Sequence, residues 1–312
     1  MKKAKILLFL LSGVSIFTAC SSDDESAPIS EKRPLIINVT ETPMDDESSE
    51  ARTATRGTIV DNSVFNQFYM RYGDDDTYHY KVTKSDRTWT ADPNSAPDGT
   101  NTFYAFSDGT FNWNSGDPYI NFSVDENIAN QKDFVVAKSA PITGNDVSLS
   151  FNHVLSAAQF EICKTAGMAD YTIDINSVEL CNVVKVGDYK YGTNSWTLSS
   201  NKTKYTLNTS PFTLSSEVTA LDLASGTKYL FLIPQTLTAW DKTAISESTT
   251  GCYLHLQCKI RKDANYKIGN ADSYGDAYLP ISGELKQNTK HTITLNVGTA
   301  LRDASGTKIT SL

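Results

Sequence analysis

The chain has 312 residues, of which 39% are hydrophobic and 21% charged, and its formal net charge is −8. This composition excludes coiled coils, collagen-like chains and polytopic membrane proteins. No basic excess is available to neutralise phosphates, so nucleic acid is not an expected partner. With 15 Tyr, 13 Phe and only four Met, the composition favours a β-rich protein over a helical enzyme.

The first 19 residues have the features of an export signal. Three lysines lie among the first five residues, and residues 6–16 form an apolar stretch too short for a permanent membrane span. Small residues then precede Cys20, as in a bacterial lipobox. We therefore expect cleavage before Cys20 and a lipid anchor, such as palmitate, on that cysteine. An ordinary secretory signal followed by a chance cysteine is the alternative.

An acidic leader extends from Cys20 to Arg56. It begins with a short acidic run, formed by Ser21, Ser22, Asp23, Asp24 and Glu25. Such a run is a solvated spacer by its charge, and it also resembles the export signal that sends lipoproteins of Bacteroidetes to the outer face of the outer membrane. The leader contains one strand-like apolar island, residues 35–39.

Beyond Arg56 the chain consists of short runs in which apolar and polar residues alternate, separated by turn residues. A period of two predicts strands with one buried and one solvated face, as in antiparallel sheets. The clearest predicted strands are residues 65–72, 102–106, 147–151, 158–162, 253–260 and 291–297. Residues 125–131 are expected to form at most one helical turn.

Many short strands with polar turns predict an all-β fold of antiparallel β-sandwiches, two of them at this length. We place the boundary near His153, which gives an N-terminal sandwich of residues 57–152 and a C-terminal sandwich of residues 153–312. The residues expected to face the cores are Phe103, Phe106, Leu149, Phe151, Phe160, Ile162, Leu232, Leu254, Leu256, Ile293 and Leu295.

The four histidines are His79, His153, His255 and His291. Their spacing matches no zinc motif, so no metal site is expected. We interpret His153 as a packed residue that hydrogen-bonds to the backbone, and His255 and His291 as strand residues.

The sequence contains no GxSxG, SxxK, GxxxxGK or GxGxxG motif. Residues 74–76 are three aspartates, but they lack the spaced ligands of an EF-hand, so a solvated loop is expected there. No catalytic residue and no cofactor is predicted, and the chain is not interpreted as an enzyme.

Four cysteines lie in the body: Cys163, Cys181, Cys252 and Cys258. An exported domain permits disulfides. Cys252 and Cys258 would be about 20 Å apart on one extended strand, so they should not bond to each other. A Cys163–Cys181 bond, bonds between either of these and the later pair, and buried free thiols all remain open.

Tryptophan side chains are a further candidate feature. The four are Trp89, Trp113, Trp196 and Trp240. Exposed, they would form a platform for sugar rings, but the strands beside most of them favour core packing.

Several segments, taken in order, resemble one family. These segments are Thr55-Arg56 and residues 130–137, 149–155, 229–235 and 290–295. Together with the lipobox, their order resembles the fimbrillin-like lipoproteins of Bacteroidetes, which are subunits of type V pili. The resemblance covers about residues 50–300.

The resemblance implies two tandem transthyretin-like β-sandwiches and a lipidated precursor on the surface of the outer membrane. It also implies that a protease cuts after an arginine in the leader, and that a strand from a neighbouring subunit replaces the strand removed. Residues 35–39 would then be the removable strand, with Arg52 and Arg56 as candidate cleavage sites. The implied partners are other fimbrial subunits, the outer membrane, and host or bacterial surface ligands.

Two other functions stay open. The tail after Val297 is short and polar, which does not favour donation of a long C-terminal strand. The roles of stalk subunit, tip subunit and surface lipoprotein that does not polymerise therefore all stay open as expectations. In the last case it would be a carbohydrate-binding lipoprotein with exposed aromatic residues. A hydrolase would instead need a pocket with convergent carboxylates.

Overall fold

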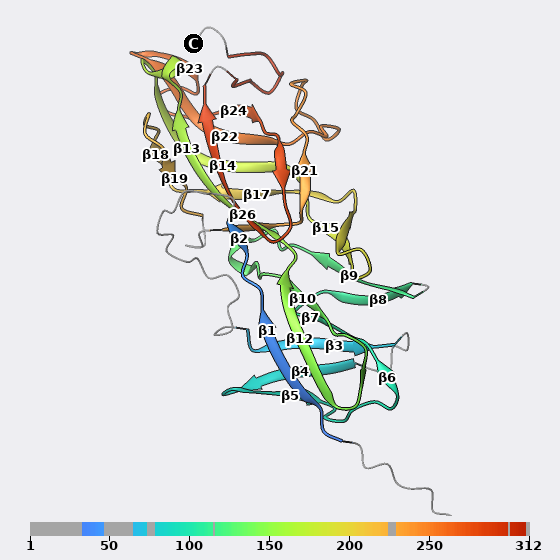
Figure 1. Ribbon diagram of the computed structural model, residues 1–312. Coiled ribbons are helices and arrows are strands. Elements are labelled where there is room, and N and C mark those ends of the chain that lie inside the picture. The colour runs from blue at the N-terminus through green and yellow to red at the C-terminus, as the bar shows by residue number, and fades with distance from the viewer. Residues whose placement is uncertain are drawn as a thin grey trace, which may run out of the picture. The chain divides into compact units, whose positions relative to one another are not determined.

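A computed structural model describes residues 33–46, 65–73, 79–114, 116–223, 229–298 and 300–309. Within these ranges all regular secondary structure is β-strand, apart from two short 3-10 turns, which confirms the predicted all-β fold (Figure 1). The turns are η1 (Ile128–Asn130), inside the segment expected to form a helical turn, and η2 (Ala166–Met168). No helix in the described ranges is long and apolar enough to cross a membrane.

The N-terminal half is built on a seven-stranded sheet with the order β1-β12-β10-β7-β3-β4-β5. Its strands are β1 (Ile36–Glu41), β3 (Gln67–Tyr72), β4 (His79–Ser85), β5 (Thr88–Asp92), β7 (Phe103–Phe106), β10 (Val135–Lys138) and β12 (Asp146–His153). A short pair beside it joins β6 (Thr100–Asn101) to β11 (Ile142–Thr143).

Two larger sheets form most of the C-terminal half. The five-stranded sheet contains β2 (Asp45–Asp46), β13 (Ser156–Lys164), β19 (Thr219–Ala220), β20 (Leu230–Leu232) and β26 (Thr289–Val297). The six-stranded sheet contains β14 (Thr172–Val184), β17 (Lys202–Asn208), β18 (Phe212–Thr213), β22 (Tyr253–Lys262), β23 (Asn265–Ile268) and β24 (Gly275–Pro280). The short pair β21 (Gln235–Leu237) and β25 (Gly283–Leu285) completes this half.

A four-stranded sheet takes its strands from both sides of the predicted boundary at residue 153. Its order is β16-β15-β9-β8, and its strands are β8 (Thr110–Asn114), β9 (Asp117–Ser123), β15 (Val186–Lys190) and β16 (Ser195–Leu198). The pairing of β9 with β15 links the two halves by backbone hydrogen bonds. The division into two transthyretin-like sandwiches therefore remains a prediction.

The alternation in the sequence explains most of the strands. In β12 every second side chain is buried, because Val147, Leu149 and Phe151 face a core and the residues between them face solvent. Strand β7 differs, since all four of its residues are buried. It lies in the middle of the seven-stranded sheet, where both faces are covered, so the expectation of one solvated face is wrong for this strand.

Two hydrophobic clusters form the interior, one within the seven-stranded sheet and a larger one extending through the C-terminal half. Every residue predicted to face a core is buried except Ile293, which is half-buried and packs against the edge of the larger cluster. Ile293 belongs to β26, in which the alternation of burial is imperfect.

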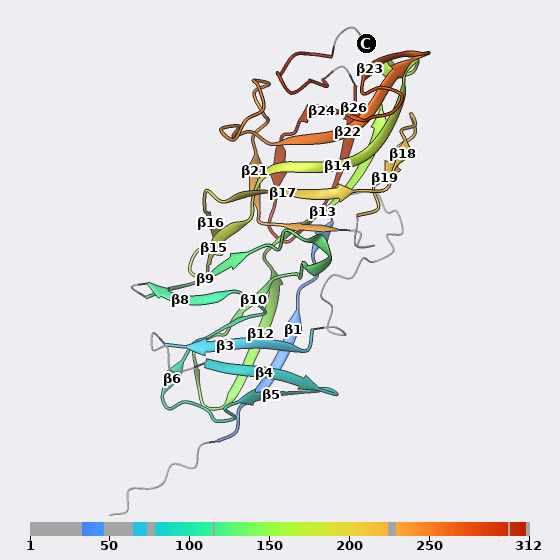
Figure 2. The same cartoon turned by 180° about the vertical axis from the view of Figure 1, so that it is seen from behind.

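Three strand pairs are parallel, in contrast to the purely antiparallel arrangement that the sequence suggested. They are β1 with β12, β13 with β26, and β2 with β26. Parallel neighbours need a long connection between them. Here that connection is the intervening chain, which joins strands that are far apart in the sequence, as Figures 1 and 2 show for β1 and β12.

Candidate functional site

One N-terminal stretch, residues 33–46, forms the edge strand of two sheets, and we call it the leader segment. Its first part, β1, is the edge of the seven-stranded sheet, and its last part, β2, is the edge of the five-stranded sheet. Figure 1 shows β1 in blue beside β12, with β2 following beside β26. Because both strands are edges, the leader segment can leave without breaking any interior strand pairing.

Backbone hydrogen bonds hold the leader segment in a parallel register. Ile36 pairs with Asp146 at one end of β1 and Glu41 with Phe151 at the other. The N–H of Thr42 donates to the carbonyl oxygen of Phe151 at 2.9 Å, which ends the β1 ladder.

Bonds to a loop close the start of the leader segment. The N–H of Leu35 donates to Oδ1 of Asn94 at 3.0 Å, and the N–H of Ala96 donates to the carbonyl oxygen of Arg33 at 2.8 Å. Both loop residues follow β5, the opposite edge of the seven-stranded sheet. The leader segment thus bridges the two edges of this sheet.

The inward side chains of the leader segment enter both hydrophobic clusters. Leu35 and Ile37 are buried in the N-terminal cluster, and Val39 packs against it. Met44, between β1 and β2, is buried in the larger cluster. Ile36 points outward and is 53% exposed. The alternation that predicted a strand at residues 35–39 is confirmed, with the strand itself running from Ile36 to Glu41.

The inward row of β1 ends in a buried polar cluster. Nε2 of His153 lies 3.3 Å from Oε1 of Glu41, and its Nδ1 lies 2.5 Å from Oδ2 of Asp133. The His153 and Asp133 side chains are each 1% exposed, and that of Glu41 is 11% exposed. The register explains the meeting, since His153 follows Phe151 on the same face of β12 and pairs with Val135 of β10.

The environment of this cluster sets its electrostatics. Burial raises the pKa of the Asp133 carboxyl, and the hydrogen bond and charge of His153 oppose that rise. His153 was expected to hydrogen-bond to the backbone, and this expectation is wrong: its ring lies between two carboxylates. A buried carboxylate is costly unless it is paired, which is the reason for this arrangement.

The functional residues predicted from motifs lie outside the residues that the structure describes. These are Cys20, the candidate cleavage sites Arg52 and Arg56, and the acidic run from Ser21 to Glu25. The removable strand is the one predicted functional element that the structure describes. Glu41 and Asp133 were missed, although the position of Glu41 in phase with the apolar residues of β1 was a usable signal.

Two of the other three histidines, His255 and His291, have structural surroundings. His255 lies on β22, where Nδ1 is 2.9 Å from Oε2 of Glu179 and Nε2 is 2.8 Å from Oδ1 of Asp276. His291 lies on β26, and its Nε2 accepts a hydrogen bond from the N–H of Lys286 at 3.0 Å. Both are strand residues, as predicted. The described part of the chain contains no group of three or more residues placed to hold a metal ion.

The four cysteines of the body are free thiols and all are buried. Of the arrangements left open by the sequence, the structure contains the one in which they pack as small hydrophobic residues. Cys163 also donates to Oδ1 of Asn296 at 3.3 Å.

The tryptophans pack in the interior rather than forming a platform. Trp89 and Trp240 are buried, and Trp113 and Trp196 are half-buried against the larger cluster. The prediction of core packing is therefore confirmed.

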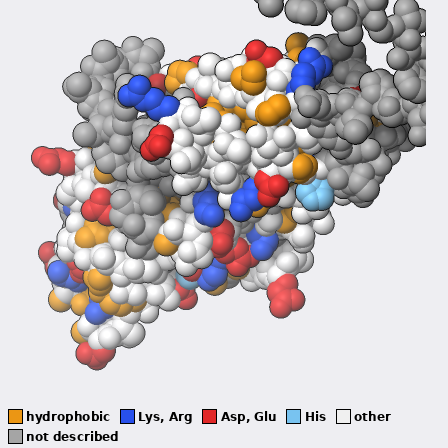
Figure 3. Space-filling model, turned by 90° about the horizontal axis from the view of Figure 1, so that it is seen from below, with side chains coloured by type: hydrophobic (Ala, Val, Ile, Leu, Met, Phe, Trp, Pro, Cys, Tyr) orange, Lys and Arg blue, Asp and Glu red, His pale blue; other side chains and the backbone are white. Residues whose placement is uncertain are grey.

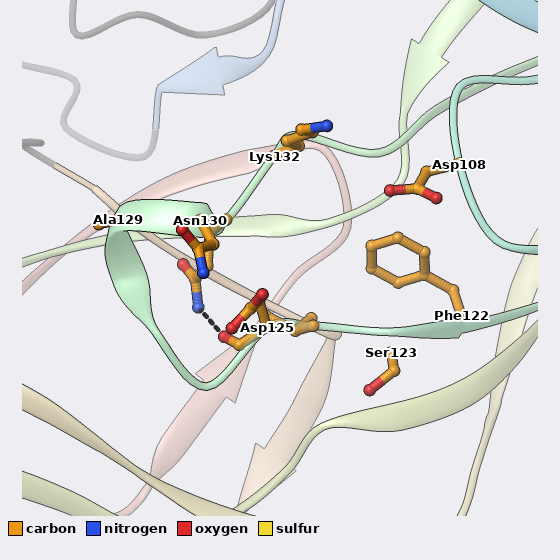
Figure 4. Close-up of a pocket in the computed structure, with 9 residues that line it drawn as sticks. Asp108, Phe122, Ser123, Asp125, Ala129, Asn130 and Lys132 are labelled. Carbon is orange, nitrogen blue, oxygen red and sulfur yellow. Dashed lines mark hydrogen bonds between the residues drawn. The ribbon is translucent and has the colours of Figure 1, made fainter.

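A depression of about 550 Å³ lies between β9 and the turn η1 (Figure 4). Its two carboxylates serve local turns. Oδ1 of Asp108 accepts from the N–H of Gly109 at 2.7 Å, and Oδ1 of Asp125 accepts from the N–H of Asn127 at 2.8 Å. Gln131 donates to the carbonyl oxygen of Asp125, the bond drawn in Figure 4. Turn structure accounts for these polar groups.

One face of the molecule, drawn in Figure 3, carries charged side chains of both signs, with hydrophobic side chains in small separate groups. This mixture is typical of a solvated surface. Among the described residues, neither this surface nor the depression gathers groups for binding or catalysis, so the leader segment, which supplies the edge strand of two sheets, is the candidate functional site.

Comparison with protein families gives one match, to the model of the fimbrillin-like family, over residues 46–311. No curated protein matches the chain.

Solved structures include similar chains. A fimbrial protein from Bacteroides vulgatus is 18% identical with a TM-score of 0.55, and the alignment covers 87% of this chain and 98% of that one. A protein named as a "putative cell adhesion protein" from Bacteroides ovatus is 15% identical with a TM-score of 0.46, over 87% of this chain and 95% of that one. At these identities the first similarity shows a shared fold.

Proposed function

The chain belongs to the fimbrillin-like family, and from that premise we propose that it is a fimbrial subunit or fimbrillin-like adhesin that assembles by protease-triggered strand replacement. The observation that carries the proposal is the leader segment, a single stretch that supplies the edge strand of two sheets. In the proposed mechanism the leader segment leaves and a strand from another subunit takes its place.

The physical basis is the surface that departure would uncover. Without the leader segment, the backbone groups of β12 that face β1 lose their partners. The emptied sites of Leu35, Ile37 and Met44 also open two hydrophobic clusters to water. Unpaired backbone beside an apolar groove binds an added strand through main-chain hydrogen bonds. While the leader segment stays in place, both edges are covered and the precursor is expected to be a monomer.

Proteolysis is the proposed trigger. Arg52 and Arg56 follow the leader segment in a stretch rich in Thr and Ala. A cut at either residue would separate the leader segment from the body. The leader segment would then be held only by noncovalent contacts, namely edge pairing and the burial of Leu35, Ile37 and Met44.

Anchoring on the cell surface is part of the proposal. We expect lipidation of Cys20 to attach the precursor to the outer membrane, with the acidic run from Ser21 to Glu25 directing it to the outer face. A Cys20→Ala variant should take up no fatty-acid probe and should leave the membrane fraction; continued labelling of the variant would contradict the anchor.

Light digestion of the purified precursor with an arginine-specific protease tests the assembly mechanism. Light scattering should show monomers before the cut and larger species after it. A variant with both Arg52→Ala and Arg56→Ala is the control, which should neither be cut there nor assemble. Strand replacement is wrong for this protein if the cut body stays monomeric at high concentration and captures no strand peptide. Glycan binding by that monomer would favour the carbohydrate-binding alternative.

A further inference from the structure

The groove under β1 has a polar end as well as an apolar floor. Along the inward face of β1 the side chains are Leu35, Ile37, Val39 and then Glu41. The first three contact the hydrophobic cluster, whereas Glu41 meets the ring of His153. The same two-residue spacing places all four, so one extended strand presents three apolar groups followed by one acid.

The partners of Glu41 belong to the body and would remain after the leader segment leaves. His153 ends β12, and Asp133 lies just before β10. Both are buried while the leader segment is in place. A replacing strand that covers them again must therefore match a buried imidazole whose other nitrogen already faces a carboxylate.

We propose that this groove selects a donated strand that carries three alternate apolar residues followed, at the position of Glu41, by a carboxylate. The inference rests on the strand replacement proposed above and names the chemistry of the partner. An apolar side chain there would remove the carboxylate that lies 3.3 Å from the buried His153 Nε2, and a buried polar group without an opposite charge or polar partner is costly. A neutral amide would give a weaker contact, because it lacks the negative charge that the carboxylate places 3.3 Å from the imidazole.

The acid would also fix the register. A shift of the incoming strand by two residues would move a carboxylate into the site of Val39 or an apolar residue onto His153. Either shift places a charged group in an apolar site or an apolar group against a buried polar one. The pattern of three apolar residues and one acid therefore fits the groove in a single alignment.

Capture of synthetic peptides by the full-length precursor, cut beforehand with the arginine-specific protease, tests the proposal. The reference peptide has the sequence of residues 33–46 and carries a fluorescent label. Its Glu41→Gln and Glu41→Leu versions probe the acid, and a Thr40→Leu version is the matched control, since Thr40 is exposed on the opposite face of β1. We expect Glu41→Leu to weaken capture roughly tenfold or more, Glu41→Gln to weaken it less, and the control to bind like the reference.

The outcomes distinguish a failure of strand replacement from a failure of the acid requirement alone. If none of the peptides, including the reference, is captured, strand replacement itself is wrong. If the Glu41→Gln or Glu41→Leu peptide is captured as well as the reference, replacement stands and the acid requirement is wrong.

A receptor variant provides a second measurement. In a His153→Gln precursor the preference for Glu over Leu should shrink, as expected for a pair in direct contact. Unchanged discrimination in this folded variant would contradict the role of His153, and the peptide series on the unaltered protein decides the question if the variant does not fold.

Discussion

Three buried thiols are held in their protonated form by their surroundings. Burial raises the pKa of Cys181, Cys252 and Cys258, each to about 12. A thiol reacts as its thiolate, so these side chains should be inert while the protein is folded.

We therefore expect Ellman's reagent at pH 8 to modify these three thiols in the native protein only as slowly as the protein opens. Unfolding in guanidinium chloride should make them react at once, which provides the control. Rapid reaction of all three in the folded protein would show that they are not buried.

Gly251 lies where a side chain has no room. A Cβ atom there would meet the backbone of Trp240 and lie 2.6 Å from the carbonyl oxygen of Ala239. At Gly283 the same addition would meet nothing within 4 Å. The two glycines thus form a matched pair.

Gly251→Ala should lower the free energy of unfolding by roughly 1–3 kcal/mol or more, because backbone must move to admit the methyl group. Gly283→Ala should change it by about 0.5 kcal/mol or less. Urea denaturation of the two variants measures the difference, and equal stabilities would contradict the close approach at Gly251.

Among the elements, strand β1 packs against the core through the side chains of one face, and its other face is exposed to solvent. Ile37 is buried on the inward face, and its neighbour Ile36 is exposed on the outward one. Both residues lie in the parallel register of β1 with β12, and neither substitution to Ala removes a backbone group, so the comparison isolates side-chain burial.

Ile37→Ala should destabilise the docked leader segment by roughly 2–5 kcal/mol, the usual cost of truncating a buried Ile. Ile36→Ala should cost about 0.5 kcal/mol or less. Hydrogen exchange of the β1 amides in the intact precursor measures this: exchange should speed up in the first variant only. Equal rates in the two variants would place β1 outside the groove.

For the whole molecule, the buried thiols predict a loss of stability in alkali. In the unfolded chain cysteines lose their protons near pH 9, whereas the folded state keeps them up to about pH 12. The unfolded state therefore binds fewer protons in this window, and stability falls as pH rises, by about 1.4 kcal/mol per pH unit for each such thiol.

Denaturation curves between pH 8 and pH 11 measure this slope. Cys258→Ala removes one of the three thiols and should make the slope shallower. A variant with an unchanged slope would mean that this thiol does not contribute.

Local pattern in the sequence determined the strands and most of the core. The alternation in residues 147–151 predicted β12, and the island at residues 35–39 predicted β1, because the period of two is a property of adjacent residues. The family resemblance added the expectation of a removable strand, and the match over residues 46–311 confirmed the family.

Only the tertiary structure decided which strands meet. Three features join residues that are distant in the chain. They are the parallel pairing of β1 with β12, the pairing of β9 with β15 across the predicted boundary at residue 153, and the contacts of His153 with Glu41 and Asp133. Alternation fixes which face of a strand is buried, and it carries no information on the neighbour or the direction of pairing. His153 shows the consequence: its burial followed from its strand, whereas its two carboxylate partners followed from the register of the sheet.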